Sequence, residues 1–307
     1  MALEGLHHIT AITADAPRNV DFYARTLGLR LVKKTVNFDQ PDVYHLYYGD
    51  ETGTPGSILT FFEFPHAAPG RHGDGMPFRV LWRVQGPDAL EFWSRRLGDE
   101  GVAVSRTDAG LLFADPEGLE HQLVADDAPD APLAALAPDI PPEHALLGFA
   151  GVRAYAADGG ASSTPLLEAL GFTASAGGHD TWQLAGDARR ASWHYDAPPG
   201  RGRQGAGSIH HIAWSAADDA ELSRFREIAA GAGARPTPII DRQYFHSVYF
   251  REPSGVLFEL ASRDIGFDVD EPEQTLGEEL KLPPQYEARR EQLQRALTPI
   301  ANPRATA

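Results

Sequence analysis

Cysteine is absent from the 307-residue chain, and its absence narrows the chemistry that the chain can carry. Disulfide bridges and thiolate metal sites are excluded, so any metal ion would have to be bound by histidine and carboxylate side chains. No apolar run approaches the roughly 20 residues that a membrane-spanning helix needs. The first residues also lack a basic region followed by an apolar run, so we expect no signal peptide and a cytoplasmic location.

Positive charge is also scarce. Lys and Arg number 27 against 43 Asp and Glu, which gives a formal net charge of −16. Nucleic acids and anionic membranes bind clustered positive charge, so we expect neither as a partner. Hydrophobic residues make up 42% of the chain and charged residues 23%, which is typical of a globular protein with a sizeable core.

A short histidine motif occurs twice, each time at the start of a predicted strand. The two copies are Gly5-Leu6-His7-His8-Ile9-Thr10-Ala11 and Gly207-Ser208-Ile209-His210-His211-Ile212-Ala213. β-Branched and apolar residues dominate both stretches, and a glycine stands just before each. A single His-His pair would carry little information, whereas the same frame at the start of two comparable segments indicates a shared structural role.

The order strand, helix and three strands recurs four times along the chain, so the predicted class is α+β with four βαβββ modules in two tandem halves. The modules are expected at residues 3–65, 77–124, 146–195 and 208–263. The expected division of the chain is an N-terminal half (1–126), a linker rich in Ala, Pro and Asp (127–144), a C-terminal half (145–265) and a charged tail (266–307) with a surface helix near residues 287–297.

One acidic residue stands inside an apolar strand of the fourth module. Glu259 lies four residues after the turn glycine Gly255, and the matching positions of the first and second modules are Thr60 and Gln122. A buried carboxylate is costly unless it is paired or binds a metal. For Glu259 the alternatives are an ion pair with Arg242 or Arg251 and a metal site.

The opening strands supply matching histidines, because His8 in the first module corresponds to His211 in the fourth, while the third module has Gly151 there. If the first and fourth modules pack about a local two-fold axis, His8, His211 and Glu259 converge. Two imidazoles and one carboxylate leave coordination positions open for substrate and O2, which suits Fe(II), with Mn(II) next. A structural zinc site needs four protein ligands in a tetrahedral arrangement, and these usually include cysteine.

Strand alternation decides which histidine of each pair is the candidate ligand. His8 shares a face with Thr10, and His211 shares one with small residues, whereas His7 and His210 share the faces of Ile9 and Ile212. The alternation therefore predicts His8 and His211 as ligands. His7 and His210 are predicted to lie behind them or to pack in the core.

These features together resemble the vicinal oxygen chelate superfamily, which includes glyoxalases, bleomycin resistance proteins and dioxygenases. Within it, the chain is similar to the four-module ring-cleaving dioxygenases of the hydroquinone type over nearly its whole length. The stretches that carry the resemblance are Leu6-His7-His8-Ile9-Thr10, Val43-Tyr44-His45-Leu46-Tyr47-Tyr48-Gly49-Asp50, Gly53-Thr54-Pro55-Gly56, Asp241-Arg242-Gln243-Tyr244-Phe245-His246-Ser247-Val248-Tyr249-Phe250-Arg251 and Pro253-Ser254-Gly255-Val256-Leu257-Phe258-Glu259.

The resemblance implies a mononuclear Fe(II) enzyme that inserts O2 into a small aromatic diol of the hydroquinone type. Its metal ligands would be His8, His211 and Glu259. The resemblance also implies further residues that contact the ligands or the substrate, with His7, His210, Arg242 and Tyr249 in catalysis and Thr10, His210, Arg242 and Tyr249 in substrate binding. In that chemistry a neutral His or Tyr would act as acid or base and Arg242 would stabilise an oxyanion.

Three other activities of the same superfamily stay open at this stage. A metal-dependent glyoxalase or isomerase typically has four protein ligands, and Thr60 replaces the fourth here. A binding or resistance protein commonly lacks the ligand set. An extradiol catechol dioxygenase generally has its metal between the third and fourth modules, where Gly151 stands in place of a histidine. The sequence leaves the accepted ring substituents and the choice between iron and manganese undetermined, and the linker and tail are the candidate interfaces of a homo-oligomer.

Overall fold

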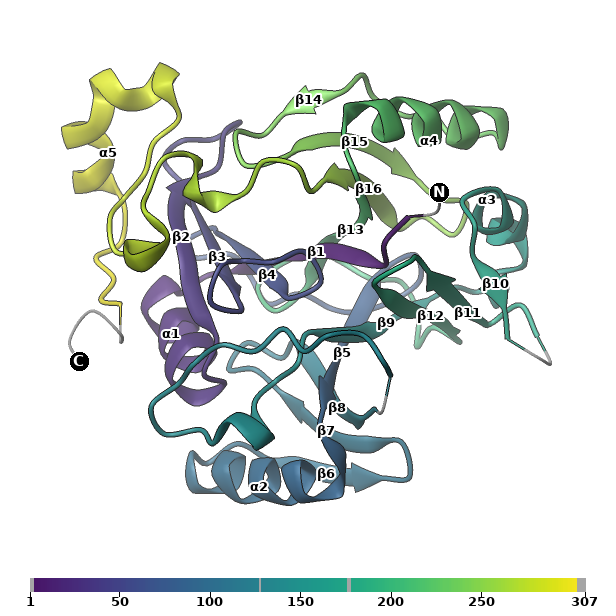
Figure 1. Ribbon diagram of the computed structural model, residues 1–307, viewed down its shortest axis with the longest axis horizontal. Coiled ribbons are helices and arrows are strands. Elements are labelled where there is room, and N and C mark those ends of the chain that lie inside the picture. The colour runs from purple at the N-terminus through teal and green to yellow at the C-terminus, as the bar shows by residue number, and fades with distance from the viewer. Residues whose placement is uncertain (1–2, 127, 176–177, 303–307) are drawn as a thin grey trace.

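A computed structural model describes residues 3–126, 128–175 and 178–302. Two eight-stranded sheets form the molecule, with helices on their outer sides (Figure 1). The four predicted βαβββ modules are confirmed. Residue 127 of the expected linker and residues 303–307 of the expected tail lie outside the described residues, as do residues 1–2.

The N-terminal half contains the first two modules. The first is β1 (Leu6–Thr13), α1 (Ala16–Val20), a π-helical turn (Asp21–Thr26), β2 (Arg30–Val36), β3 (Tyr44–Gly49) and β4 (Ile58–Glu63). The second is β5 (Pro77–Val84), α2 (Gly86–Asp99), β6 (Val104–Thr107), β7 (Gly110–Ala114) and β8 (Glu120–Ala125). The first helix starts at Ala16, where the Asp15 side chain accepts a hydrogen bond from the Arg18 N–H and caps it.

The C-terminal half contains the other two modules. The third is β9 (Phe149–Tyr155), α3 (Thr164–Ala169), β10 (Thr173–Ala174), β11 (Thr181–Ala185) and β12 (Arg190–Asp196). The fourth is β13 (Ile209–Ala216), α4 (Asp219–Gly231), β14 (Ile240–Asp241), β15 (His246–Arg251) and β16 (Leu257–Ser262). The strand β10 is only two residues long and exposed, so the hydrophobic pattern does not locate it in the sequence.

The sheets join modules from different halves. The strand order of one is β14-β15-β16-β13-β1-β4-β3-β2, which combines modules one and four, and that of the other is β10-β11-β12-β9-β5-β8-β7-β6, which combines modules two and three. The antiparallel pairing of β1 with β13 closes the first sheet in its middle (Figure 1). Neither half forms a sheet of its own. The first module therefore packs against the fourth, which is the condition under which His8, His211 and Glu259 were expected to converge.

Both central strands of the first sheet carry a β-bulge at the histidine motif. In the pairing of β1 with β13, His7 has no partner residue between Leu6 and His8. On the other strand, His210 has no partner residue either. The second sheet has matching register shifts at Phe78 and Ala150. Bulges re-aim side chains and are frequent next to functional sites. Their repetition shows that the fold builds the same distortion in both sheets.

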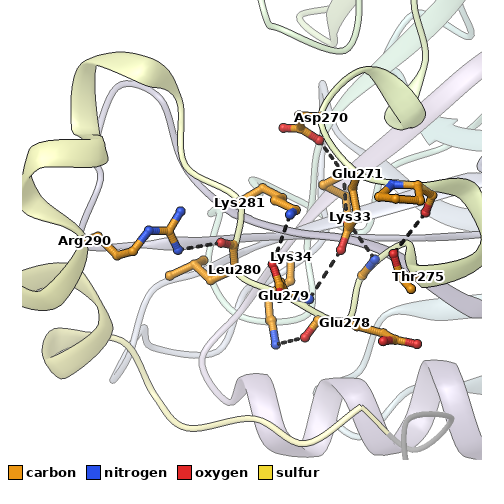
Figure 2. Close-up of polar contacts among 12 residues, drawn as sticks. Lys33, Lys34, Asp270, Glu271, Thr275, Glu278, Glu279, Leu280, Lys281 and Arg290 are labelled. Carbon is orange, nitrogen blue, oxygen red and sulfur yellow. Dashed lines mark hydrogen bonds and ion pairs between the residues drawn. The ribbon is translucent and has the colours of Figure 1, made fainter.

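The chain after β16 runs back across β2, and a buried lysine ties the two together. Lys33 on β2 is fully buried, and its Nζ donates to Asp270 Oδ1 at 2.7 Å and to Glu271 Oε2 at 2.8 Å. Figure 2 shows these side chains between the tail and the strand. Asp270 Oδ2 in turn accepts hydrogen bonds from Gln243 and Tyr244, which precede β15. The tail thus connects the two ends of the first sheet.

Backbone contacts extend the tail along the same strand. The Lys281 N–H donates to the Lys34 carbonyl at 2.9 Å, the Lys34 Nζ donates to the Glu278 carbonyl, and Arg290 donates to the Leu280 carbonyl (Figure 2). A 3-10 turn (Pro284–Arg289) and α5 (Arg290–Ala296) follow where one surface helix was predicted. The helix is amphipathic, because Leu293 is buried in the main core while its neighbours are exposed.

Replacing Lys33 by Met is expected to destabilise the protein by about 3–5 kcal/mol, because the buried Glu271 would keep its charge without its counter-ion and Asp270 would lose its partner. The matched control is Lys281→Met, which removes a lysine paired with the exposed Glu279 and is expected to cost at most about 1 kcal/mol. Urea unfolding of both variants measures the difference. Equal midpoints for the two variants would contradict a stabilising role of the Lys33 pair.

Candidate metal centre and its cavity

Two imidazoles and one carboxylate meet in the middle of the first sheet. The Nε2 atoms of His8 and His211 lie 3.2 and 2.9 Å from Glu259 Oε2, and 3.2 Å from each other. All three side chains are buried, and their ligand atoms lie within 4.8 Å of one another. It is the one group of this kind in the part of the chain that the structure describes. The predicted convergence is confirmed, and these three residues could hold a metal ion.

Strand pairing sets this geometry. His8 and His211 come from β1 and β13, the paired central strands, and His211 lies 203 positions further along the chain. Glu259 comes from β16, which pairs with β13 so that Glu259 stands opposite Ala213. The small Ala213 side chain, two residues after His211, leaves room on that face for the carboxylate.

The Glu259 carboxylate is ionised. Burial by itself raises the pKa of Glu259, but the imidazoles of His8 and His211 hold that pKa well below its usual range. Ser247 Oγ donates to Oε1 at 2.5 Å, whereas the buried Oε2 faces only the Nε2 atoms of the two imidazoles among the described residues. Neither Arg242 nor Arg251 pairs with Glu259, so the alternative of an ion pair with one of them is wrong.

The proton arrangement around His8 fits a cation. His7 Nε2 lies 3.0 Å from the Ser262 carbonyl, which can only accept, so this nitrogen carries a proton. Burial lowers the pKa of His7 to about 3, so the ring is neutral and its Nδ1 must accept from His8 Nδ1, 2.9 Å away. In neutral His8 the lone pair then lies on Nε2, facing Glu259 Oε2. A positive ion among these atoms would bind both the lone pair of His8 Nε2 and Glu259 Oε2.

The strict alternation predicted for the two histidine pairs is wrong. The bulges turn His7 against His8 and His210 against His211, with Nδ1–Nδ1 distances of 2.9 and 2.8 Å. His7 is buried behind His8, as predicted. His210 lines the same cavity as His211, and not a separate core face. A run of alternating residues gives no sign of a bulge, so the sequence could not reveal this.

A cavity of about 560 Å³ opens beside the three residues, and both His8 and His211 line it. Its apolar wall includes Phe62, Phe64, Phe245 and Leu257. Its polar groups include His45, Tyr47, His210, Arg242 and Tyr249. Pockets that bind small aromatic molecules have this composition, with an apolar lining and a few convergent polar groups.

The predicted residues Arg242 and Tyr249 form one unit at the wall of the cavity. Arg242 Nε donates to the Tyr249 hydroxyl at 3.2 Å, and its guanidinium lies 5.3 Å from the centre of that ring. The Tyr249 ring meets the His211 ring edge-on, with centroids 5.9 Å apart. Arg242 also donates to Asp39 on the opposite loop. The Arg242 guanidinium thus lies near the site and stays paired with the exposed Asp39.

Thr10 does not line the cavity. Its hydroxyl is fully buried and lies 2.8 Å from the Thr60 hydroxyl, which lies 2.9 Å from His45 Nε2. Thr10 is therefore connected to the cavity through Thr60 and His45. Its substrate contact stays a prediction.

Sequence reasoning missed His45 and Tyr47 as residues of the site. Both stand on β3 and line the cavity, yet they belong to a strand whose other members are buried apolar or aromatic residues. The sequence feature that could have identified them is the presence of polar atoms at alternate positions of a predicted buried strand. The signal is weak, because a tyrosine or histidine in such a strand is as often a packed core residue.

The fold and the site agree with comparisons to known proteins. The family model described as Glyoxalase/Bleomycin resistance protein/Dioxygenase superfamily matches residues 5–123 and 152–260. The chain belongs to this superfamily. Maize (Zea mays) glyoxalase I, a solved member of the fold, superposes with a TM-score of 0.60 at 14% identity, covering 85% of this chain and 94% of its own in one mutant structure, which supports the fold alone.

Relatives within the superfamily match almost end to end. The "Putative ring-cleaving dioxygenase MhqO" of Bacillus subtilis is 39% identical over 96% of both chains. The "Chlorohydroquinone/hydroquinone 1,2-dioxygenase" of Sphingobium indicum is 33% identical, again over 96% of both. A Bacillus subtilis crystal structure described as a putative dioxygenase superposes with a TM-score of 0.90 at 38% identity, with 98% of each chain covered. No helix among the described residues of this superfamily member has the length and apolar character needed to cross a membrane.

Replacing His7 by Phe is expected to weaken metal binding by about 10–100-fold without abolishing it, because the hydrogen bond that orients His8 would be lost. Removing a predicted ligand, as in Glu259→Ala, is expected to abolish high-affinity binding. Titration of the purified protein with Mn(II) measures both, with His144→Phe in the linker as a matched control. A His7→Phe affinity equal to that of the control would show that His7 does not orient His8.

Proposed function

We propose that this protein is an Fe(II)-dependent ring-cleaving dioxygenase that inserts O2 into an aromatic substrate of the hydroquinone type. The observation that carries the proposal is the buried set of His8, His211 and Glu259 at the wall of an aromatic-lined cavity. The end-to-end similarity to relatives named as ring-cleaving dioxygenases supports it.

The ligand set favours iron. Two histidines and one carboxylate with open positions are typical of non-haem Fe(II) oxygenases, and Mn(II) is the next choice. The first module has no fourth ligand to offer, because Thr60 at the matching position is engaged with Thr10 and His45. A bound ion of this type would supply the site at which a substrate oxygen and O2 react. This open set also argues against a four-ligand glyoxalase or isomerase centre.

The side chains around the cavity bind and orient the ring. Phe62, Phe64 and Phe245 offer apolar and aromatic surface that excludes water. The Arg242 guanidinium stabilises negative charge that develops on an oxygen of the substrate. Its hydrogen bond to the Tyr249 hydroxyl holds both groups at the same wall.

His210 supplies a proton donor to the cavity. Burial, followed by the neighbouring His211, lowers the pKa of His210 to about 3, so its ring is neutral near pH 7. If His211 binds the metal through Nε2, its Nδ1–H donates to His210 Nδ1, 2.8 Å away. The remaining proton of His210 then stands on Nε2. That N–H can donate a hydrogen bond to a ligand oxygen in the cavity.

The proposed function predicts oxygen uptake by the Fe(II)-loaded protein with hydroquinone and methylhydroquinone and little or none with catechol. Loading is done without oxygen, and an oxygen electrode records uptake after each diol is added. His211→Ala, which removes a ligand, should abolish uptake. Uptake with catechol alone would assign the protein to the extradiol class, and no uptake with any diol by metal-bound protein would refute the dioxygenase proposal.

Replacing Arg242 by Gln is expected to lower kcat with hydroquinone by about 10²–10³-fold and to change KM less, because a donor to developing negative charge contributes mainly in the transition state. The matched control is Arg251→Gln, an exposed arginine that donates only to the Gly255 carbonyl. Steady-state oxygen uptake gives both constants. A kcat that matches that of the control would exclude the proposed role.

A further inference from the structure

Two tyrosines occupy equivalent positions on opposite sides of the metal centre. Tyr47 on β3 pairs with Thr60 on β4, and Tyr249 on β15 pairs with Glu259 on β16. Thr60 and Glu259 are the matching residues of the first and fourth modules. Each tyrosine therefore stands two strands away from a central histidine strand, and both line the cavity.

The two hydroxyls have different partners. Tyr249 accepts a hydrogen bond from Arg242, a permanent donor, whereas the Tyr47 hydroxyl lies 2.8 Å from His45 Nδ1. The His45 ring is held in place by contacts with Tyr47 and Phe62, at centroid distances of 4.0 and 4.3 Å. Tyr249 is thus fixed beside a cation, and Tyr47 faces a group that can either donate or accept.

His45 is a neutral imidazole. Burial, followed by the neighbouring His8, His211 and Arg242, holds the pKa of His45 well below its usual value. A neutral ring has one donor and one acceptor nitrogen. Its Nε2 lies 2.9 Å from the Thr60 hydroxyl, which lies 2.8 Å from the Thr10 hydroxyl. Both of these neighbours are hydroxyls that can reverse their direction.

The chain from Thr10 to Tyr47 therefore has two complete arrangements. In one, the Tyr47 O–H donates to His45 Nδ1, His45 donates to Thr60 and Thr60 donates to Thr10. The phenol oxygen of Tyr47 can then accept a hydrogen bond from a ligand hydroxyl. In the other, every bond is reversed, and the O–H of Tyr47 is available to a ligand oxygen that can only accept.

We propose that Tyr47, held by His45, is the second anchor of the aromatic substrate and binds the ring oxygen that is remote from the metal centre. The inference rests on the proposed function, because it requires a substrate with an oxygen at each end of the ring. A para-diol has such an oxygen, whereas an ortho-diol places both oxygens at the metal. Tyr47 and His45 thereby select para-diols, and the reversible chain allows them to bind a hydroxyl as well as an oxo group.

Anaerobic binding to the Fe(II)-loaded full chain tests the inference without turnover. Hydroquinone is compared with phenol, which lacks the remote oxygen. One hydrogen bond corresponds to about a tenfold tighter binding of hydroquinone by the unaltered protein. Tyr47→Phe is expected to bind hydroquinone no more tightly than phenol, with the affinity for phenol unchanged. Calorimetric titration measures both constants.

Two further variants act as controls. Tyr48→Phe makes the same chemical change one residue further along β3, where the hydroxyl donates to Asn19 in the core, and should keep the tenfold preference. Thr60→Val breaks the chain behind His45 and should reduce the preference, and Thr60→Ser should restore it. A purely structural role of Thr60 would lower the affinity for both ligands together.

The outcomes separate this inference from the proposed function. An unchanged preference in Tyr47→Phe, or an equal loss of affinity for hydroquinone and phenol, would overturn the anchoring role of Tyr47. Hydroquinone that binds with the expected preference but supports no oxygen uptake would refute the dioxygenase proposal and leave the anchor supported. Failure of the unaltered protein to bind either ring would overturn both.

Discussion

The antiparallel pairing of β1 with β13 is the contact on which the rest of the site depends. It brings His8 and His211 together across 203 positions of sequence, and β16 adds Glu259 through its pairing with β13. The same pairing contains the two bulges that turn His7 and His210 against the candidate ligands. A sheet that closed within each half would have separated the two histidines, and no ligand set could have formed.

The direction of the hydrogen bonds around the centre follows from one backbone carbonyl. The Ser262 carbonyl can only accept, so it fixes the proton of His7, and His7 then fixes that of His8. The chain from Tyr47 through His45 has no such fixed point, because it ends in the Thr10 and Thr60 hydroxyls. The centre is therefore set to hold a cation, whereas this chain can respond to its ligand.

Much of the fold and of the centre could be predicted from the sequence. The recurring βαβββ order gave the modules, because turn glycines and strand periodicity are local signals. The duplicated histidine motif and a lone carboxylate in an apolar strand pointed to His8, His211 and Glu259. The bulges could not be predicted, because one residue passed over in a pairing leaves no trace in the hydrophobic pattern. For this reason strand alternation placed His210 on a core-like face, whereas it lines the cavity, where the resemblance also placed it.

The sequence by itself determined the elements, the absence of thiolate chemistry and the three residues able to hold a metal ion. Only the tertiary structure decided which modules share a sheet, since strand pairing between distant segments depends on packing of the whole chain. It also placed His45 and Tyr47 in the cavity and Lys33 beneath the tail, between Asp270 and Glu271. Those positions join residues from elements far apart in the chain, and no local pattern encodes such distances.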